Sequence, residues 1–196
     1  MDKRIILASK SKVRKKILDE NSIECTVQPS NVDEDTVKES LDKQGASPEE
    51  VSKNLAELKS NKISQKFPES FVIGADSVID FMGKIISKPE DRKEALKILK
   101  NLNGKTHYLI SSVCISKNGS MIWNYTDKAI LTMKKMSNEE LEKYLSKISD
   151  DDLYAYNVYQ IEGLGRSLFS KIQGNENTIM GLPVERIKKY LQEYND

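Results

Sequence analysis

Hydroxyl and cationic side chains gather near the start of the chain in a pattern that suits phosphate binding. Ser9, Lys10, Ser11, Lys12 and Arg14 follow a short apolar run and open a helical pattern. A phosphate group needs several hydrogen-bond donors and a forked cation at close range, and the free N–H groups of a helix start favour an anion. The alternative is a capped helix with a solvated lysine face. We expect a strand, an anion-binding loop and a helix here.

A second candidate for chemistry is Asp76, which lies within an apolar, β-prone segment after Gly74 and Ala75. A carboxylate in such surroundings carries a desolvation cost that structure or function must offset. It could ligate a metal or act as a general base, or it could cap a nearby turn. Glu34 lies in an acidic loop, where its charge is either solvated or completes a carboxylate pair that holds Mg²⁺.

Two lysines and the histidine are further side chains whose role can be inferred from their position in the sequence. Lys88 lies between a strand and a helix, where it could point at the same phosphates, and Lys59 lies on the polar face of its expected helix. Plain solvent exposure is the alternative for both lysines. His107, the single histidine, is interpreted as a hydrogen-bonded structural residue. Nucleophile-elbow, Walker and dinucleotide-binding motifs are absent from the sequence, which disfavours esterases, ordinary kinases and Rossmann enzymes.

Composition limits the function classes further. The chain has 196 residues, of which 38% are hydrophobic, so it can bury a core as one domain over residues 1–196. Its 31 Lys+Arg residues against 30 Asp+Glu leave a net charge of +1, which disfavours nucleic acid as a partner. Cys25 and Cys114 are expected to be buried thiols. The sequence contains no membrane-spanning run or signal-peptide core, so we expect a cytoplasmic protein without a membrane partner.

The elements that must position these side chains can be read from periodicity and caps. A polar loop is expected over residues 29–45, and the strand that holds Asp76 is expected to be interrupted or ended there. The order of strands and helices predicts a mixed α/β protein. Strands are expected at 4–8, 25–28, 71–80, 84–87, 108–116, 121–133 and 167–172, and helices at 12–20, 48–66, 91–103, 138–148 and after Pro183.

Taken together, the segments resemble the Maf family of nucleoside triphosphate pyrophosphatases over nearly the whole chain. Residues 7–14 resemble the family's LASxSPRR opening, residues 29–34 its PSxxDE segment and residues 74–78 its GADTV segment. Further similarity is carried in the correct order by residues 55–59 (LAxxKA), 87–89 (GKP), 159–165 and 181–183. One such motif is weak evidence, whereas seven in sequence are strong.

The resemblance implies a Maf/ITPase-like fold: a twisted mixed β-sheet flanked by helices, with two lobes around a central cleft. It also implies hydrolysis of a nucleoside triphosphate to a monophosphate and pyrophosphate, a requirement for Mg²⁺ or Mn²⁺, and a homodimer. By carry-over, Glu34 and Asp76 would bind metal, with Asp76 as the preferred catalytic base. The side chains that would hold the triphosphate are Ser9, Ser11, Arg14, Lys59 and Lys88.

Departures from the family pattern fall at positions associated with the base. Val13 replaces an arginine, Ser77 replaces a threonine, and Glu162 replaces a glutamine. Valine cannot donate a hydrogen bond, and an ionised glutamate only accepts. The base preference therefore stays open between nucleotides like 7-methyl-GTP and those like dTTP or UTP. A non-catalytic, nucleotide-binding regulator of cell division is the alternative function.

Overall fold

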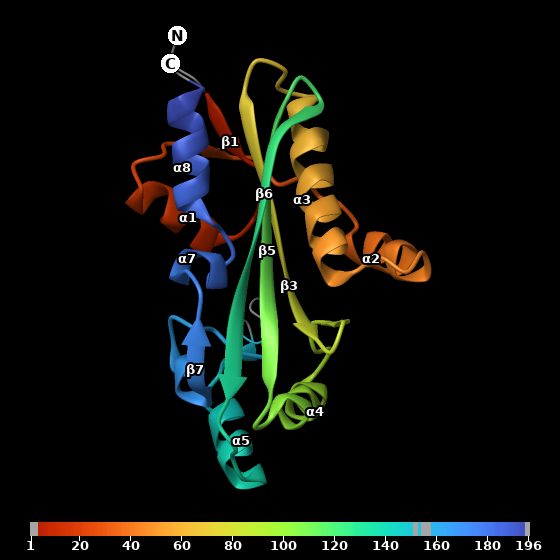
Figure 1. The fold of residues 1–196 in the computed structure, drawn as a ribbon, viewed down its shortest axis with the longest axis vertical. Helices are drawn as coiled ribbons and strands as arrows, with labels where there is room; N and C mark the ends of the chain where they lie inside the picture. Colours follow the sequence, from red (N-terminus) through yellow and green to blue (C-terminus); the bar gives the residue numbers. More distant parts are fainter. Residues whose placement is uncertain (1–3, 151–152, 154–157, 195–196) are drawn as a thin grey trace. The chain divides into compact units, whose positions relative to one another are not determined.

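The computed structural model describes residues 4–150, 153 and 158–194. Figure 1 shows the course of the chain and labels most of its elements. The helices and strands are β1 (Ile5–Leu7), α1 (Lys12–Glu20), β2 (Thr26–Val27), α2 (Glu34–Lys43), α3 (Pro48–Ser64), β3 (Phe71–Phe81), β4 (Lys84–Ile86), α4 (Arg92–Leu102), β5 (Thr106–Lys117), β6 (Ser120–Met133), α5 (Asn138–Leu145), the 3₁₀ helix η1 (Leu164–Leu168), β7 (Phe169–Gln173), α7 (Glu176–Ile179) and α8 (Val184–Glu193).

The strands form one mixed sheet in the order β2-β1-β3-β5-β6-β7, with β4 paired to β3. β1 pairs in parallel with both β2 and β3, and Ile6 lies opposite Thr26 on one side and Val72 on the other. The pairs β3–β4 and β6–β7 are antiparallel. The expectation of a mixed α/β fold with helices flanking a mixed sheet is therefore confirmed.

The chain divides into two compact units. Unit 1 comprises residues 1–78, 110–128 and 175–196, and unit 2 comprises residues 79–109 and 129–174. β3, β5 and β6 contribute residues to both units. Within the described residues, no helix is long and apolar enough to cross a membrane.

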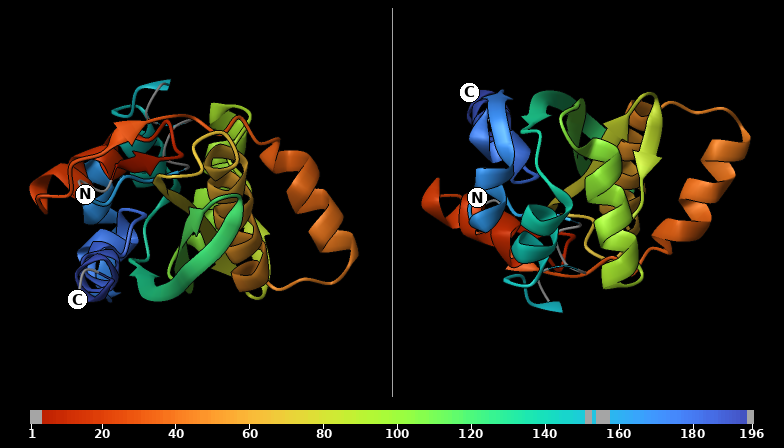
Figure 2. Two further views of the ribbon diagram at one scale, coloured as in Figure 1. Left: turned by 90° about the horizontal axis from the view of Figure 1, so that it is seen from above. Right: turned by 90° about the horizontal axis from the view of Figure 1, so that it is seen from below.

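Unit 1 packs helices on both faces of its strands (Figure 1). Side chains alternate along β1 and β3, because successive residues of a strand point to opposite faces. Leu7 and Ile73 contribute to a buried cluster with α1 and α8. Ile6 and Val72 face the other way and pack with Ile63 of α3. Figure 2 shows α2 on the far side of α3 from these strands.

The approach of α3 to β3 is very close at Gly74. A Cβ atom built there would lie 2.2 Å from the Ala56 carbonyl oxygen and 2.7 Å from the Ser60 backbone nitrogen. Both are backbone atoms, which cannot move aside as a flexible side chain can. Gly74 therefore interrupts the apolar pattern of this segment without interrupting the strand, and it allows α3 to lie directly against the start of the polar segment 76–77.

In unit 2, α4 and α5 contact each other, and a buried aromatic cluster surrounds His107. The His107 side chain has no exposed surface, and its Nε2 lies 2.8 Å from the hydroxyl of Tyr159. Phe169 also packs near the imidazole ring. The interpretation of His107 as a structural, hydrogen-bonded residue agrees with this environment.

Two sequence expectations about the secondary structure of unit 1 are wrong. Residues 29–45 are not all loop, because they contain α2, whose N-cap Asp33 accepts a hydrogen bond from the backbone N–H of Thr36 at 3.1 Å. No residue of α2 is buried, so the helix has no apolar stripe to reveal it. The segment around Asp76 is also not an interrupted strand, since β3 is continuous. The tyrosine-bearing loop expected after residue 148 lies partly outside the described residues.

Replacing Gly74 by alanine tests the close approach of α3 to β3. We expect Gly74→Ala to lower the free energy of unfolding by about 2 kcal/mol or more, because the added methyl group overlaps backbone atoms. Urea denaturation followed by circular dichroism measures this. Gly163→Ala is the control, since its nearest neighbour is the end of the Gln160 side chain at 3.4 Å. Equal unfolding midpoints for the two variants would contradict the packing argument.

Acid should destabilise the protein through His107. Burial lowers the pKa of His107 from 6.5 to about 4. Between these two values the unfolded chain binds a proton that the folded chain does not, so stability is full above pH 6.5 and falls as the pH drops towards 4. The loss amounts to about 3 kcal/mol. His107→Gln should flatten this part of a plot of unfolding free energy against pH, and an unchanged slope would exclude His107 as its source.

Candidate functional site

The loop between β1 and α1 brings the first predicted residues together by local hydrogen bonds. Ser11 is the N-cap of α1, and its Oγ accepts from the backbone N–H of Arg14 at 3.3 Å. The Ser9 Oγ accepts from the backbone N–H of Ser11 at 3.2 Å and from Nη1 of Arg14 at 3.4 Å. Both lone pairs of the Ser9 hydroxyl are thus engaged, and its proton is the part left to offer to an anion.

Arg14 ties this loop to the rest of unit 1. Its Nε donates to the Gly181 carbonyl at 2.9 Å, Nη1 donates to the Ala75 carbonyl at 2.9 Å, and Nη2 donates to the Ser77 hydroxyl at 3.2 Å. With the bond to Ser9, four of the five guanidinium N–H groups have acceptors within the protein. Arg14 is therefore held in place by three separate segments, with one N–H group left.

A buried lysine joins the two carboxylates that the sequence singled out. Nζ of Lys59 lies 2.7 Å from Oδ1 of Asp76 and 2.8 Å from Oε1 of Glu34. Lys59 and Asp76 are 5% and 4% exposed. The Ser52 hydroxyl also donates to the backbone carbonyl of Asp76 at 3.1 Å. The structure thus brings Glu34, at the start of α2, to Asp76 in β3 through a side chain of α3.

The expected position of Lys59 on a polar helix face is wrong, and the spacing of α3 explains why. Residues four apart lie on one helix face, so Lys59 continues the buried stripe of Val51, Leu55 and Ile63. The neighbouring Leu58 is instead 42% exposed. The helix thus presents a cation where its pattern calls for an apolar side chain, directly beside the carboxylate of β3.

The charges of the site act on one another. Burial lowers the pKa of Arg14, and the charges of Asp76 and Glu34 partly oppose this effect. Burial raises the pKa of Glu34, but Lys59, Lys38 and Arg14 together outweigh it and leave that pKa below its usual value. Glu34 is therefore ionised at neutral pH. Two cations and two carboxylates form a set of side chains that is neutral overall.

One carboxylate oxygen of Asp76 is not used by the described residues. Its Oδ1 binds Lys59, whereas Oδ2 is buried and has no hydrogen-bond partner among the described residues. A buried polar atom without a partner costs free energy unless a water molecule or an ion bonds to it. The described residues contain no group of three or more His, Cys, Asp or Glu side chains that could hold a metal ion alone. Two carboxylates with a free oxygen instead fit a hard cation that brings other oxygen ligands with it.

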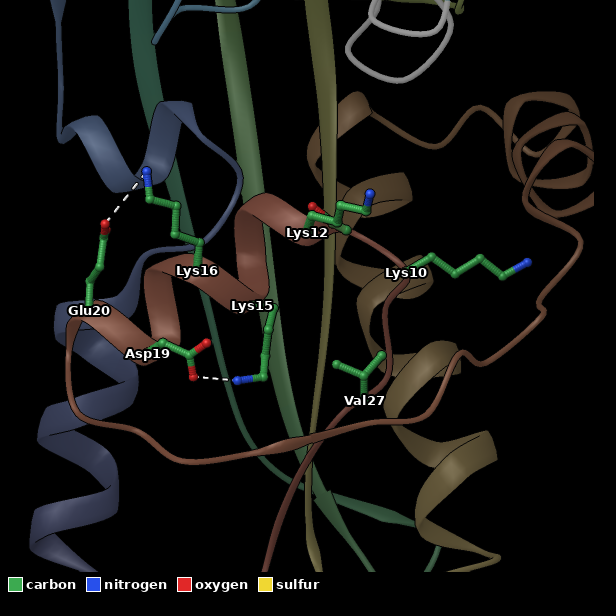
Figure 3. A pocket seen from close by; sticks show the side chains of 8 residues that line it. Lys10, Lys12, Lys15, Lys16, Asp19, Glu20 and Val27 are labelled. Carbon is green, nitrogen blue, oxygen red and sulfur yellow. Dashed lines mark hydrogen bonds and ion pairs between the residues drawn. The ribbon is translucent and has the colours of Figure 1, made fainter.

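A pocket of about 370 Å³ opens on the outer side of α1, and it does not include Asp76 (Figure 3). Nζ of Lys16 lies 3.6 Å from Oε1 of Glu20, and Lys15 forms an ion pair with Asp19. Two of the lysines that line the pocket therefore already have partners. Its lining residues are Lys10, Ser11, Lys12, Lys15, Lys16, Asp19, Glu20 and Val27. Lys10 and Lys12 of the predicted anion-binding loop therefore lie on a surface beside the start of α1.

The remaining predicted residues fall into two groups. In unit 1, Ser77 bonds to Arg14, whereas Val13 packs against the buried cluster beneath α1. In unit 2, Lys88 is exposed just after β4. Glu162 is also exposed in unit 2 and accepts a hydrogen bond from Gln160 at 3.1 Å.

Two residues at the site, Ser111 and Thr178, escaped the sequence analysis, and the contact of Gly181 with Arg14 was not predicted. The Ser111 Oγ lies 2.8 Å from the Ser77 Oγ and donates to the Thr178 carbonyl, also at 2.8 Å. Gly181 supplies an acceptor for Arg14. A pair of serines within the apolar segment 108–116 was a visible signal for Ser111, but local sequence carries no sign that Thr178 would meet it.

The sequence is similar to known proteins over nearly its whole length. The family model described as "Maf-like protein" matches residues 4–194. A nucleoside triphosphate pyrophosphatase of Pelagibacter ubique (strain HTCC1062) is 74% identical, over 98% of each chain. A protein of the same name from Ruegeria sp. (strain TM1040) is 37% identical, over 97% of this chain and 96% of its own.

A further relative carries a different name. The 7-methyl-GTP pyrophosphatase of Rhizobium etli (strain ATCC 51251 / DSM 11541 / JCM 21823 / NBRC 15573 / CFN 42) is 34% identical, over 98% of this chain and 97% of its own. Because the family model and these relatives all extend over nearly the full sequence, the chain that carries the Lys59-linked carboxylates belongs to the Maf-like family.

Proposed function

We propose that this chain is a nucleoside triphosphate pyrophosphatase, which releases pyrophosphate and a nucleoside monophosphate. The observation that carries the proposal is the buried bridge from Lys59 to Asp76 and Glu34, with the unpartnered Oδ2 of Asp76. The names of the relatives support the reaction class. Cleavage at the α-phosphate needs a carboxylate to orient water and positive charge to stabilise the leaving group.

The triphosphate binds through donors that the protein leaves free. The hydroxyl protons of Ser9 and Ser11 are available, because the known bonds of both hydroxyls use their oxygen as acceptor. Arg14 has one N–H group left, and the ammonium of Lys59 has a third N–H beyond those directed at the carboxylates. These donors of unit 1 suit the oxygens of a phosphate chain. Lys88 of unit 2 is a further candidate for phosphate binding, which rests on the family resemblance alone.

Glu34 and Asp76 would hold a divalent cation, Mg²⁺ or Mn²⁺. When bound, the metal ion supplies positive charge to the phosphate oxygens and to the leaving pyrophosphate. The need for it follows from charge, because the set formed by Glu34, Asp76, Lys59 and Arg14 is neutral and does not balance a triphosphate by itself. Carboxylate oxygens, as Glu34 and Asp76 carry them, are ligands of the kind such cations prefer.

Asp76 is the general base. Lys59 binds Oδ1 and keeps the carboxylate in one orientation, which leaves Oδ2 as the oxygen that accepts the proton of the attacking water. The oxygen of that water bonds to the α-phosphorus, and the bond from the α-phosphorus to the bridging oxygen breaks. The electron pair of that bond leaves with pyrophosphate, where the cations of the site stabilise its charge.

Val13, Ser77 and Glu162 are proposed to take part in base recognition, and the preferred base stays unresolved. The relatives include proteins named for nucleoside triphosphates in general and for 7-methyl-GTP. Glu162 accepts from Gln160 and retains further acceptor capacity, which suits a cationic base. The family resemblance also supports a homodimer in the cytoplasm that acts on free nucleotides, with neither nucleic acid nor membrane as a partner.

A nucleotide panel tests the reaction. Incubation with ATP, GTP, ITP, CTP, UTP, dTTP or 7-methyl-GTP and Mg²⁺ or Mn²⁺ should release pyrophosphate and a monophosphate, identified by ion-exchange chromatography. Release of orthophosphate would place the cleaved bond elsewhere. Tight nucleotide binding without turnover of any nucleotide would favour the non-catalytic regulator instead.

Asp76→Asn tests the proposed base. The substitution keeps the shape of the side chain but removes its charge and most of its basicity, so kcat should fall about 100- to 10,000-fold. Asp80→Asn is a matched control, because Asp80 is a second buried carboxylate of β3, whose Oδ1 accepts from the backbone of Gly83. We expect near-wild-type kcat for that control. Wild-type turnover in a folded Asp76→Asn protein would remove Asp76 from the mechanism.

A further inference from the structure

A row of hydrogen bonds runs inward from Arg14 through the interior of unit 1. Nη2 of Arg14 donates to the Ser77 Oγ at 3.2 Å, and the Ser77 Oγ lies 2.8 Å from the Ser111 Oγ. Ser111 in turn donates to the Thr178 carbonyl at 2.8 Å. Ser111 has no exposed surface, whereas Ser77 is partly exposed. The row therefore leads from the Ser77 hydroxyl, which is within reach of solvent, to the buried carbonyl of Thr178.

Counting protons along this row gives each bond a direction. A serine hydroxyl has one proton and two lone pairs. Ser111 uses its proton on the Thr178 carbonyl, so in the bond between the two hydroxyls Ser77 must donate and Ser111 must accept. The single proton of Ser77 then points inward. Its oxygen accepts from Arg14 and keeps one lone pair, for which no described residue supplies a donor.

The same segments hold the oxygen of Ser77 in place. The Thr178 carbonyl also accepts from the backbone N–H of Gly181 at 3.0 Å, so both of its lone pairs are used. Gly181 has a positive φ of 96°, and a Cβ atom there would lie 3.0 Å from the Ser77 Oγ. Thr178 is anchored in addition through its hydroxyl, which donates to Asp127 at 2.6 Å. The hydroxyl of Ser77 thus has little freedom to turn its proton outward.

We propose that Ser111 is a specificity-determining positioning residue, which makes Ser77 an acceptor-only group that selects nucleotides by an N–H donor on the base. The proposal rests on the proposed function and names the feature of the substrate that this site reads. A base that places a carbonyl or an unprotonated ring nitrogen opposite Ser77 sets acceptor against acceptor. Such a base loses a hydrogen bond and leaves its own acceptor unpaired.

Two pairs of nucleotides isolate this effect. ITP carries a carbonyl and a ring N–H where ATP carries an amino group and an unprotonated ring nitrogen, and UTP differs from CTP in the same way. At positions 1 and 6 of the purines and at positions 3 and 4 of the pyrimidines, one member of a pair presents a donor where the other presents an acceptor. The wild-type enzyme should therefore discriminate within at least one pair by roughly fivefold or more in kcat/KM.

The decisive variant is Ser111→Ala, which frees the proton of Ser77 to turn outward. We expect the ratio of kcat/KM within the discriminated pair to move towards one by roughly three- to tenfold, mainly through KM. The control is Ser112→Ala, because the neighbouring Ser112 hydroxyl lies 2.9 Å from Thr126 Oγ1 and takes no part in the row. The ratio should be unchanged in that variant.

A double-mutant cycle separates positioning from a general structural effect. If Ser111 acts through Ser77, then Ser111→Ala changes the ratio in the wild-type background but not in a Ser77→Ala background. Equal loss of activity on all nucleotides, or the same change of ratio in both backgrounds, would overturn the proposal. So would a wild-type enzyme that does not discriminate within either pair.

Binding measurements keep this test separate from the test of catalysis. Dissociation constants of the same four nucleotides, measured by isothermal titration calorimetry without metal, should show the same change of ratio in Ser111→Ala. A protein that binds without hydrolysing any nucleotide would contradict the pyrophosphatase proposal while these constants still decide the role of Ser111. Unchanged ratios of the constants in Ser111→Ala would reject that role.

Discussion

The site depends on one buried cation, Lys59, which holds two carboxylates that come from different elements. Asp76 belongs to a strand in the middle of the sheet, whereas Glu34 begins an exposed helix, and the ammonium group is bonded to both. Removing the Asp76 carboxylate and the Lys59 ammonium from water is costly, and their attraction offsets this cost only when the geometry is good. The side chain of Glu34 stays partly exposed. An arrangement of this kind is poor evidence for stability, but it holds the carboxylate oxygens of Asp76 and Glu34 in fixed positions around one ammonium group.

The backbone must come very close for Lys59 to reach this position. Because Gly74 has no side chain, α3 lies against β3 where a Cβ atom would meet the Ala56 carbonyl oxygen at 2.2 Å. The small Ser60 sits at the same contact. Lys59 and Ser52, which lie on one face of the helix about two turns apart, then reach the carboxylate and the backbone carbonyl of Asp76. The absence of a side chain at Gly74 is therefore needed both for the packing of α3 on β3 and for the contact between Lys59 and Asp76.

Features that depend on neighbouring residues could be predicted from the sequence. Contacts between residues far apart in the sequence could not. Ser11 as a helix cap and Asp76 as a carboxylate in an apolar strand are visible locally, and the structure has both. The burial of Lys59 was missed, although its spacing from Leu55 places it on the apolar stripe, because a charged side chain is usually assigned to solvent. The bond between Ser77 and Ser111 joins residues 34 positions apart. Such contacts depend on strand pairing, which single-sequence patterns do not determine.

Arg14 gives the two sides of the site opposite hydrogen-bonding character. Nη1 donates to Ser9, whose oxygen already accepts a backbone N–H, so the Ser9 hydroxyl is left as a donor. Nη2 donates to Ser77, whose proton is directed to Ser111, so the Ser77 hydroxyl is left as an acceptor. A donor suits a phosphate oxygen and an acceptor suits an N–H of a base. One guanidinium group, fixed by the Ala75 and Gly181 carbonyls, thus gives two chemically identical serines the opposite characters that the proposed phosphate-binding and base-reading roles require.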